Sequence, residues 1–406
     1  MAHYTLKEQR DTYMITVMND CVLNAYPNGK KVSFDQMAGG KKAFKKLWEN
    51  IFIRICFNIA LPLIMLLVDI YLPLKFSVAI FFRKKNQVQS NRYFIGHERL
   101  LYTITKRIGL QQDGDVWLRL LDSNYELPEK KTVAELLDFV TFGDVMKCAL
   151  QSVLLHIKVI REYGYNMYFL SYKAFEWCMA DYAIRHIPED AELVFSFICD
   201  RYSVMIDKSP HKNKSLIQHG TMHFKNKSLE IPYLVFEEDK GFYIWTSLYK
   251  CSPSKVYCYT ETDEWALSNS VIANNPQYIH IGYGFKPSFA PSKKSVLIVS
   301  NFYIFAPKEE QILIQLQDLD VEIYLKNHPS HADSLYDDMR SKYNFTFIAG
   351  YSTSYPAVDI LISYDSTLAC EYASIGTKVL YYGHFDIANV RNVVKGILEV
   401  DHDFRS

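Results

Sequence analysis

The segment DILISYDSTLACEYASIGTKVLYY, residues 359–382, decides the fold. It begins with a short apolar run, passes through a polar loop that ends at Asp365, and continues from Ser366 as an expected helix. Gly376 is suited to end that helix, and a second apolar run follows it. A strand, a helix and another strand in so short a segment predict one unit of a parallel α/β sheet.

The same alternation extends towards the N-terminus from this segment. Short apolar runs ended by polar residues or glycine predict buried parallel strands. These runs lie at 193–198, 215–218, 255–259, 278–281, 295–300, 321–326 and 345–349. We therefore expect an α/β fold with two Rossmann-like domains whose parallel sheets face a central cleft, and helical additions at the N-terminus.

The domain boundary is expected in the proline-containing segment 283–294. Residues 91–283 then form a first Rossmann-like domain, and residues 284–406 form a second one. Within the first domain, apolar residues recur at three and four positions from about 90 to 190, so we expect that region to be mainly helical.

Residues 1–90 contain an apolar stretch, 51–82, between two groups of basic residues. Pro62 and Pro73 are expected to kink any helix there, and the longest run without charge, 55–68, is too short to cross a bilayer. The basic flanks are Lys41, Lys42, Lys45 and Lys46 on one side and Arg83, Lys84 and Lys85 on the other. This pattern predicts an apolar hairpin or an interfacial helix that touches the inner face of the membrane, or else a buried helix or helix pair.

Overall composition excludes several classes of protein. Lysine plus arginine equals aspartate plus glutamate, 45 each, so no overall positive field favours nucleic acid as a partner. The eight cysteines form no CxxC pair and have no histidine at ligand spacing, so we expect reduced thiols and no zinc site. The start of the chain does not resemble a cleavable signal peptide, which favours a cytoplasmic location.

Three short elements follow expected strands and could carry chemistry: residues 218–221 (QHGT), residues 326–329 (KNHP), and the loop and helix within 359–382. Ser366 and Thr367 would present hydroxyls beside the free amides of a helix N-terminus, where a phosphate is stabilised. Glu371, one turn further, could accept the ribose hydroxyls. The simpler alternative is that Ser366 only caps the helix and Glu371 only complements its dipole.

In their order and spacing these elements resemble the superfamily of GT-B transferases for capsule and teichoic acid, which includes enzymes similar to CDP-glycerol glycerophosphotransferase and CMP-sugar-dependent capsule glycosyltransferases. The matching positions are His219, Gly220 and Thr221 in the first element, His328 and Pro329 in the second, and Asp359, Leu361, Ile362, Ser363, Asp365, Ser366, Thr367, Glu371, Gly376 and Val379 in the third. Met222 and Lys378 depart from the glycerophosphotransferase pattern, which leaves the donor open.

The resemblance implies the GT-B fold and a glycosyltransferase that uses a nucleotide-activated sugar, CMP-linked by preference, to build a bacterial capsule or lipopolysaccharide. The partners would be the nucleotide donor, bound by the domain of residues 284–406, and a polysaccharide or lipid-linked glycan acceptor, bound by the domain of residues 91–283. The alternatives are a polyol phosphotransferase that uses CDP-glycerol or CDP-ribitol, a sugar-nucleotide epimerase, and a non-catalytic membrane-associated scaffold.

The implied donor site, extended by the loop after 295–300, comprises Ser300, Asn301, His328, Pro329, Ser366, Thr367 and Glu371. His219 or Asp200 would take the proton from the attacking hydroxyl, a role suited to a group whose pKa lies near neutrality. No DxD motif follows an expected strand, so we expect no metal and no cofactor besides the nucleotide-sugar co-substrate.

Overall fold

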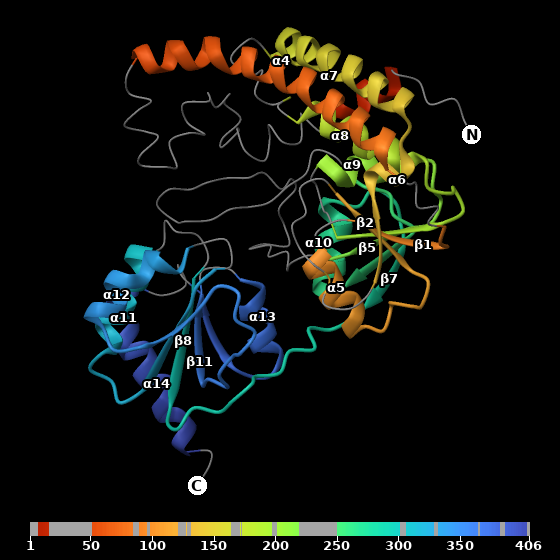
Figure 1. The fold of residues 1–406 in the computed structure, drawn as a ribbon. Helices are drawn as coiled ribbons and strands as arrows, with labels where there is room; N and C mark the ends of the chain where they lie inside the picture. The colour runs from red at the N-terminus through yellow and green to blue at the C-terminus, as the bar shows by residue number, and fades with distance from the viewer. Residues whose placement is uncertain are drawn as a thin grey trace. The chain divides into compact units, whose positions relative to one another are not determined.

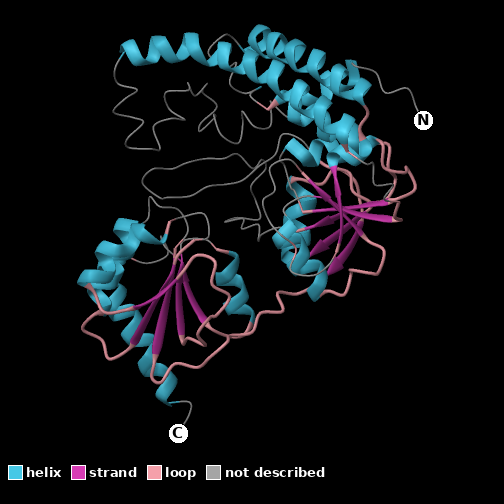
Figure 2. Cartoon of the chain, in the orientation of Figure 1, coloured by secondary structure: helices cyan, strands magenta, loops and turns pink. Residues whose placement is uncertain are grey.

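The computed structural model of the chain describes residues 7–15, 51–83, 89–95, 98–120, 127, 131–163, 171, 173–196, 201–218, 250–300, 306–328, 332–363, 366–381 and 386–403. The chain divides into two compact units, with the division between Ile281 and Gly282. Each unit contains a parallel sheet with helices packed on it (Figures 1 and 2), which confirms the α/β class. The central cleft between the two sheets stays a prediction.

The first unit has a seven-stranded sheet in the order β3-β2-β1-β4-β5-β6-β7, and its neighbouring strands are parallel. This is a doubly wound order, in which the chain builds one half outward from β1 and the other half from β4. The strands are β1 Arg92–Ile95, β2 Val116–Arg119, β3 Thr132–Glu135, β4 Glu192–Phe195, β5 Lys214–Ile217, β6 Lys255–Cys258 and β7 Gln277–His280.

The described part of residues 90 to 190 is mainly helical, as expected, but the sequence pattern does not predict the first three strands. Each of β1, β2 and β3 has only four residues, with a charged residue at one end. Runs this short show neither a long apolar stretch nor a clear alternation, so the helical pattern around them dominates the sequence signal.

Helices cover both faces of this sheet because successive strand residues point to opposite sides. Phe94 and Trp117 stack with ring centroids 4.5 Å apart in the core that also contains Leu101 of α5. Tyr93 and Phe195 belong to the other core, with residues of α7, α8 and α10. The helices are α4 Ile51–Phe82, α5 Glu98–Arg107, α6 Leu136–Phe139, α7 Phe142–Tyr163, α8 Ala174–Arg185, α9 Arg201–Asp207 and α10 Glu261–Ser270.

The apolar N-terminal stretch forms one continuous helix, α4, so the expected hairpin is wrong. Pro62 and Pro73 each remove one backbone hydrogen bond from this helix. They lie about three turns apart, so both missing hydrogen bonds are on the same side of the helix. Packing on α7 supports α4 (Figure 1), and Asp69 Oδ2 lies 2.6 Å from Nε2 of His156 on α7. Among the helices described, none is both long and apolar enough to span a membrane.

The second unit has a five-stranded parallel sheet in the order β10-β9-β8-β11-β12. Its strands are β8 Ser295–Val299, β9 Glu322–Lys326, β10 Thr346–Ile348, β11 Ile360–Ser363 and β12 Lys378–Tyr381. Its helices are α11 Ala306–Leu316, η4 Asp333–Tyr336, α12 Asp337–Lys342, α13 Thr367–Ser374, η5 Ile387–Asn389 and α14 Val390–Asp403. Figure 1 shows α11 and α14 on one face of the sheet and α13 on the other.

Candidate functional site

The strand order of the second unit defines where a ligand is expected to bind. The chain builds β9 and β10 on one side of β8, then crosses to build β11 and β12 on the other. Ligands of open α/β sheets bind at the carboxyl ends of the strands beside such a reversal. Lys326, Val299 and Ser363 are in register on β9, β8 and β11, so these three strands end together at that edge.

Helix α13 begins at this edge, directly after β11. Ser366 is its N-cap, with extended backbone angles, and its hydroxyl accepts a hydrogen bond from the amide of Leu368 at 3.2 Å. The Ala369 amide also donates to Ser366, to its carbonyl at 2.9 Å, and the helix dipole favours an anion at this end. The cap that the sequence predicts is therefore present, and it is compatible with both the structural and the phosphate-binding interpretation.

Thr367 and Glu371 are four residues apart on α13 and so share one face of the helix. Both are half-buried. The opposite face is fixed in the core, because Ala369 and Tyr372 are buried and the Tyr372 hydroxyl donates to the Pro356 carbonyl at 2.5 Å. The helix thus has one orientation on the sheet, and Thr367 and Glu371 lie on the same side of it.

The end of β9, which precedes His328, is held by polar contacts. The side-chain amide of buried Asn327 donates to Asp333 at 2.7 Å, and Asp333 also accepts from the Gly350 amide at 3.1 Å. These two hydrogen bonds lower the pKa of Asp333, so it stays ionised. His328 is half-buried and directly follows Asn327 in the sequence.

The strand-end lysine Lys326 was not assigned a role from the sequence. Its side chain is buried, and Nζ donates to the carbonyls of Asn327 and Gly350 at 2.7 and 2.6 Å. A positive charge at the edge where β8, β9 and β11 end makes the electrostatic potential there more positive, which favours the binding of an anion. The only sign of this role in the sequence is the position of Lys326 at the end of an apolar run that predicts a strand.

Ser300, at the end of β8, lies in a buried polar network that the sequence did not predict. Its hydroxyl is 2.6 Å from the Tyr336 hydroxyl, which donates to Glu309 Oε2 at 2.8 Å. Burial raises the pKa of Glu309 to about 7, although hydrogen bonds from Tyr336 and Ser300 act to lower it. A phosphate contact by the Ser300 hydroxyl would therefore require it to leave Tyr336.

The other expected site residues, Asn301, Pro329, Asp200 and His219, lie outside the described residues. The strand end before His219 is described. Gln218 is buried, its side-chain amide donates to Asp263 at 2.7 Å, and its side-chain oxygen accepts from the Tyr259 amide at 3.0 Å. These contacts fix Gln218, the residue that directly precedes the HGT element in the sequence.

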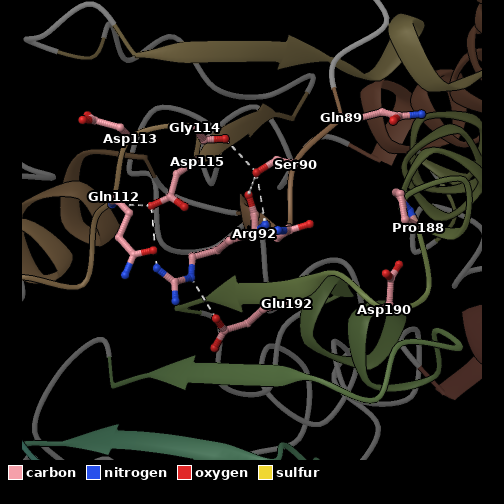
Figure 3. Close-up of a pocket in the computed structure, with 11 residues that line it drawn as sticks. Gln89, Ser90, Arg92, Gln112, Asp113, Gly114, Asp115, Pro188, Asp190 and Glu192 are labelled. Atoms are coloured by element: carbon pink, nitrogen blue, oxygen red, sulfur yellow. Dashed lines mark hydrogen bonds and ion pairs between the residues drawn. The ribbon is translucent and has the colours of Figure 1, made fainter.

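A cavity of about 660 Å³ lies at the opposite edge of the first unit's sheet, where β1, β2 and β4 begin (Figure 3). Arg92 at its centre pairs with Glu192 at 2.8 Å and lies 3.8 Å from Asp115. Burial acts to raise the pKa of Glu192, but hydrogen bonds from Ser215 and Arg92 lower it overall. These charges satisfy one another, and the amino ends of parallel strands are not where such sheets bind ligands. We assign the cavity no catalytic role.

Comparisons with known proteins identify no family for the chain. No protein-family model matches the chain, and no curated protein matches it. Three solved structures are similar: the wall teichoic acid polymerase TagF soaked with CDPG, a UDP-N-acetylglucosamine 2-epimerase from Rickettsia bellii, and MurG from Acinetobacter baumannii.

The TagF match has 10% identity and a TM-score of 0.37, and covers 80% of this chain and 78% of that one. The epimerase match has 10% identity and a TM-score of 0.39, and covers 76% and 87%. The MurG match has 9% identity and a TM-score of 0.33, and covers 76% and 90%. These scores are too low to carry an argument, so the fold rests on the strand order and register above.

Proposed function

We propose that this protein is a GT-B-type glycosyltransferase that uses a CMP-linked sugar to build a bacterial surface polysaccharide, a capsule or lipopolysaccharide. The observation that carries the proposal is the capped N-terminus of α13 at the edge where β8, β9 and β11 end together. A phosphate-binding helix end beside a strand-order reversal is a recurring position for nucleotides in α/β folds.

In the proposed donor site, the phosphate lies against the first turn of α13, near Ser366 and Thr367, with His328 and the loop that begins at Ser300 and Asn301 on its other side. Pro329 shapes the turn after His328. Glu371 accepts the ribose hydroxyls. Fixed donors around the leaving phosphate stabilise its charge as the bond to the sugar breaks.

The proposed chemistry is displacement at the anomeric carbon. An acceptor hydroxyl forms the new bond to that carbon, the bond to the nucleotide phosphate breaks, and the nucleotide leaves with the electron pair. His219 or Asp200 takes the proton of the attacking hydroxyl. Both residues follow the ends of neighbouring strands, β5 and β4, in the first unit.

A donor panel tests this function. The protein is incubated with CMP-, CDP- and UDP-linked donors, with and without a glycan acceptor, and the products are identified by mass spectrometry. Transfer of a sugar from a CMP-linked donor supports the proposal. Transfer of glycerol or ribitol phosphate from a CDP-linked donor would assign the phosphotransferase instead, and an altered sugar nucleotide formed without acceptor would assign an epimerase. No turnover with any donor would leave the scaffold interpretation.

We also propose that α4 holds the protein peripherally at the inner face of the cell membrane. The helix has many large apolar side chains at the surface, among them Leu67 at 63%, Phe81 at 83% and Phe82 at 79% exposure. Exposed apolar surface of this extent is typical of an interaction site, and a helix in the membrane interface buries such side chains. The flanking residues Lys41, Lys42, Lys45 and Lys46 lie outside the described residues.

Co-sedimentation with anionic vesicles tests this location. The double variant Phe81→Ser and Phe82→Ser should move the protein from the vesicle pellet to the supernatant. Tyr351→Ser, which removes a side chain of the second unit that is 67% exposed, is the matched control and should not. If the wild-type protein stays in the supernatant at every ionic strength, the exposed face of α4 has another partner.

A further inference from the structure

Three side chains that the proposed function does not use meet at the carboxyl edge of the first unit's sheet. Cys258 and His280 are the last residues of the neighbouring strands β6 and β7, and they are paired in register. Glu264 lies in the first turn of α10, which follows β6. In a parallel sheet, paired residues of adjacent strands point to the same face, so the thiol and the imidazole lie side by side.

The distances in this cluster suit a common ligand. One donor atom each from Cys258, Glu264 and His280 lies within 4.8 Å of the other two. His280 Nε2 and Glu264 Oε2 are 2.6 Å apart. The Cys258 side chain is fully buried, whereas those of His280 and Glu264 are 40% and 38% exposed. The cluster therefore has a buried thiol at its base and two groups at its mouth that solvent can reach.

A fourth polar group faces the same cluster. Tyr278 lies two residues before His280 on β7 and so on the same face of the sheet. Its hydroxyl is buried and has no hydrogen-bond partner in the part of the chain that the structure describes. Burial, together with the nearby charges of Glu264 and Cys258, raises the pKa of Tyr278 to about 12. The hydroxyl is thus a polar group on the same face of the sheet as the thiol and the imidazole.

Without a metal ion, the surroundings of Cys258 favour the thiol over the thiolate. Burial, followed by the negative charges of Glu264 and Asp263, raises the pKa of Cys258 to about 12. A thiol in this state is a poor nucleophile. A divalent cation reverses the effect, because it neutralises the carboxylate and stabilises the thiolate as a ligand.

We propose that Cys258 Sγ, His280 Nε2 and a Glu264 carboxylate oxygen bind one divalent transition-metal ion of the Zn²⁺ type. On binding, the thiol loses its proton to solvent, and the contact between His280 and Glu264 opens to admit the ion. Thiolate and imidazole ligands select Zn²⁺ and Co²⁺ over Mg²⁺ and Ca²⁺. Three protein ligands leave the fourth tetrahedral position to water, as in zinc sites that remain accessible to a ligand.

The proposed ion would lie close to the end of the neighbouring strand β5. Gln218 directly follows β5 and precedes the HGT element in the sequence. Gln218 is bonded to Asp263, which precedes Glu264 on α10. The metal ligand on α10 is thus one residue from the contact that fixes the end of β5. This inference is independent of the proposed transferase activity, and it differs from the sequence-based expectation that no metal binds.

The test is a titration of the untagged, metal-free protein with Co²⁺, which gives a thiolate-to-metal charge-transfer band and intense visible bands when tetrahedral. We expect one Co²⁺ per chain, displaced by Zn²⁺ but not by excess Mg²⁺. Cys258→Ser should abolish the charge-transfer band. Glu264→Gln and His280→Ala should each weaken Co²⁺ binding by about tenfold or more, at least the loss typical of an outer-sphere contact.

Matched variants make the result specific. Cys251→Ser removes another buried thiol of the same unit, and Glu261→Gln changes another glutamate of the first turn of α10, so both should keep the wild-type titration. Because Glu264 is partly exposed, Glu264→Gln tests the site even if Cys258→Ser fails to fold. A wild-type protein without the charge-transfer band, or an unchanged band in Cys258→Ser or an unchanged affinity in Glu264→Gln, overturns the proposal.

Discussion

The two units have the same kind of parallel sheet, and each buries an ionisable group whose pKa is shifted towards the neutral form, an acid in one unit and a base in the other. The second unit holds Glu309 beneath the end of β8, where burial raises the pKa to about 7. The first unit holds His211, just before β5, where burial lowers the pKa to about 4. Each group is therefore neutral inside the folded protein over part of the pH range in which it would be charged outside. The same sheet architecture should thus respond to pH in opposite directions in its two copies.

The largest expected effect is at Glu309. The unfolded glutamate ionises near pH 4.5 and the folded one near pH 7, so the unfolded state releases its proton first as the pH rises. Stability of the second unit should fall by about 3 kcal/mol between these pH values. Glu309→Gln should remove this fall while keeping the acceptor for Tyr336, as measured by the unfolding temperature at pH 5 and pH 8. Glu310→Gln, the next residue on α11, should keep the fall.

His211 should give the opposite dependence in the first unit. The unfolded histidine binds a proton near pH 6.5 and the folded one only near pH 4, so stability falls as the pH decreases through this window. We expect a loss of about 2 to 3 kcal/mol. His211→Gln can still donate to the Ile187 carbonyl, which His211 Nε2 approaches at 3.2 Å, and should flatten the acid limb of the stability profile. Equal acid sensitivity in the variant and the wild type would contradict this assignment.

The two units also differ in how far their sequences predict them. In the second unit every strand corresponds to an apolar run between polar or glycine residues, so the alternation was predictable. In the first unit β1, β2 and β3 are four-residue strands among amphipathic helices. Their strand conformation depends on hydrogen bonding to neighbouring strands, which the local sequence does not show. The continuity of α4 was not predictable either, because it depends on packing against α7.

The candidate site shows the same limit. The cap at Ser366 and its spacing to Glu371 are local patterns, so the sequence predicts them. The network of Ser300, Tyr336 and Glu309 joins groups far apart in sequence, and the sequence alone could not show that the Ser300 hydroxyl already has a partner. The cluster of Cys258, Glu264 and His280 depends on the register of β6 and β7. This register cannot be derived from the spacing of the three residues in the sequence.

A third prediction tests whether the donor binds to the second unit and not to the first. If the donor phosphate binds at the carboxyl edge of the second unit, His328→Ala should weaken donor affinity by about 1.5 to 3 kcal/mol, the contribution of a charge-assisted hydrogen bond. His186→Ala, which changes a histidine of the first unit, should leave donor affinity unchanged. Calorimetry with the donor identified by the panel measures both. If His328→Ala binds the donor as tightly as the wild-type protein, His328 does not contact the donor phosphate.

The smallest expected effect distinguishes a ribose contact from a helix-dipole contact at Glu371. If the carboxylate accepts the ribose hydroxyls, Glu371→Gln should lose about 1 kcal/mol of affinity for a ribonucleotide and less for its 2′-deoxy analogue, which lacks one of the two hydroxyls. If Glu371 only complements the helix dipole, the variant should change stability by a few tenths of a kcal/mol and nothing else. Glu399→Gln on α14 is the control for loss of a negative charge in the same unit, and it should not change either affinity. Equal losses for the ribo- and deoxyribonucleotide would place Glu371 outside the ribose site and leave α13 with a phosphate contact alone.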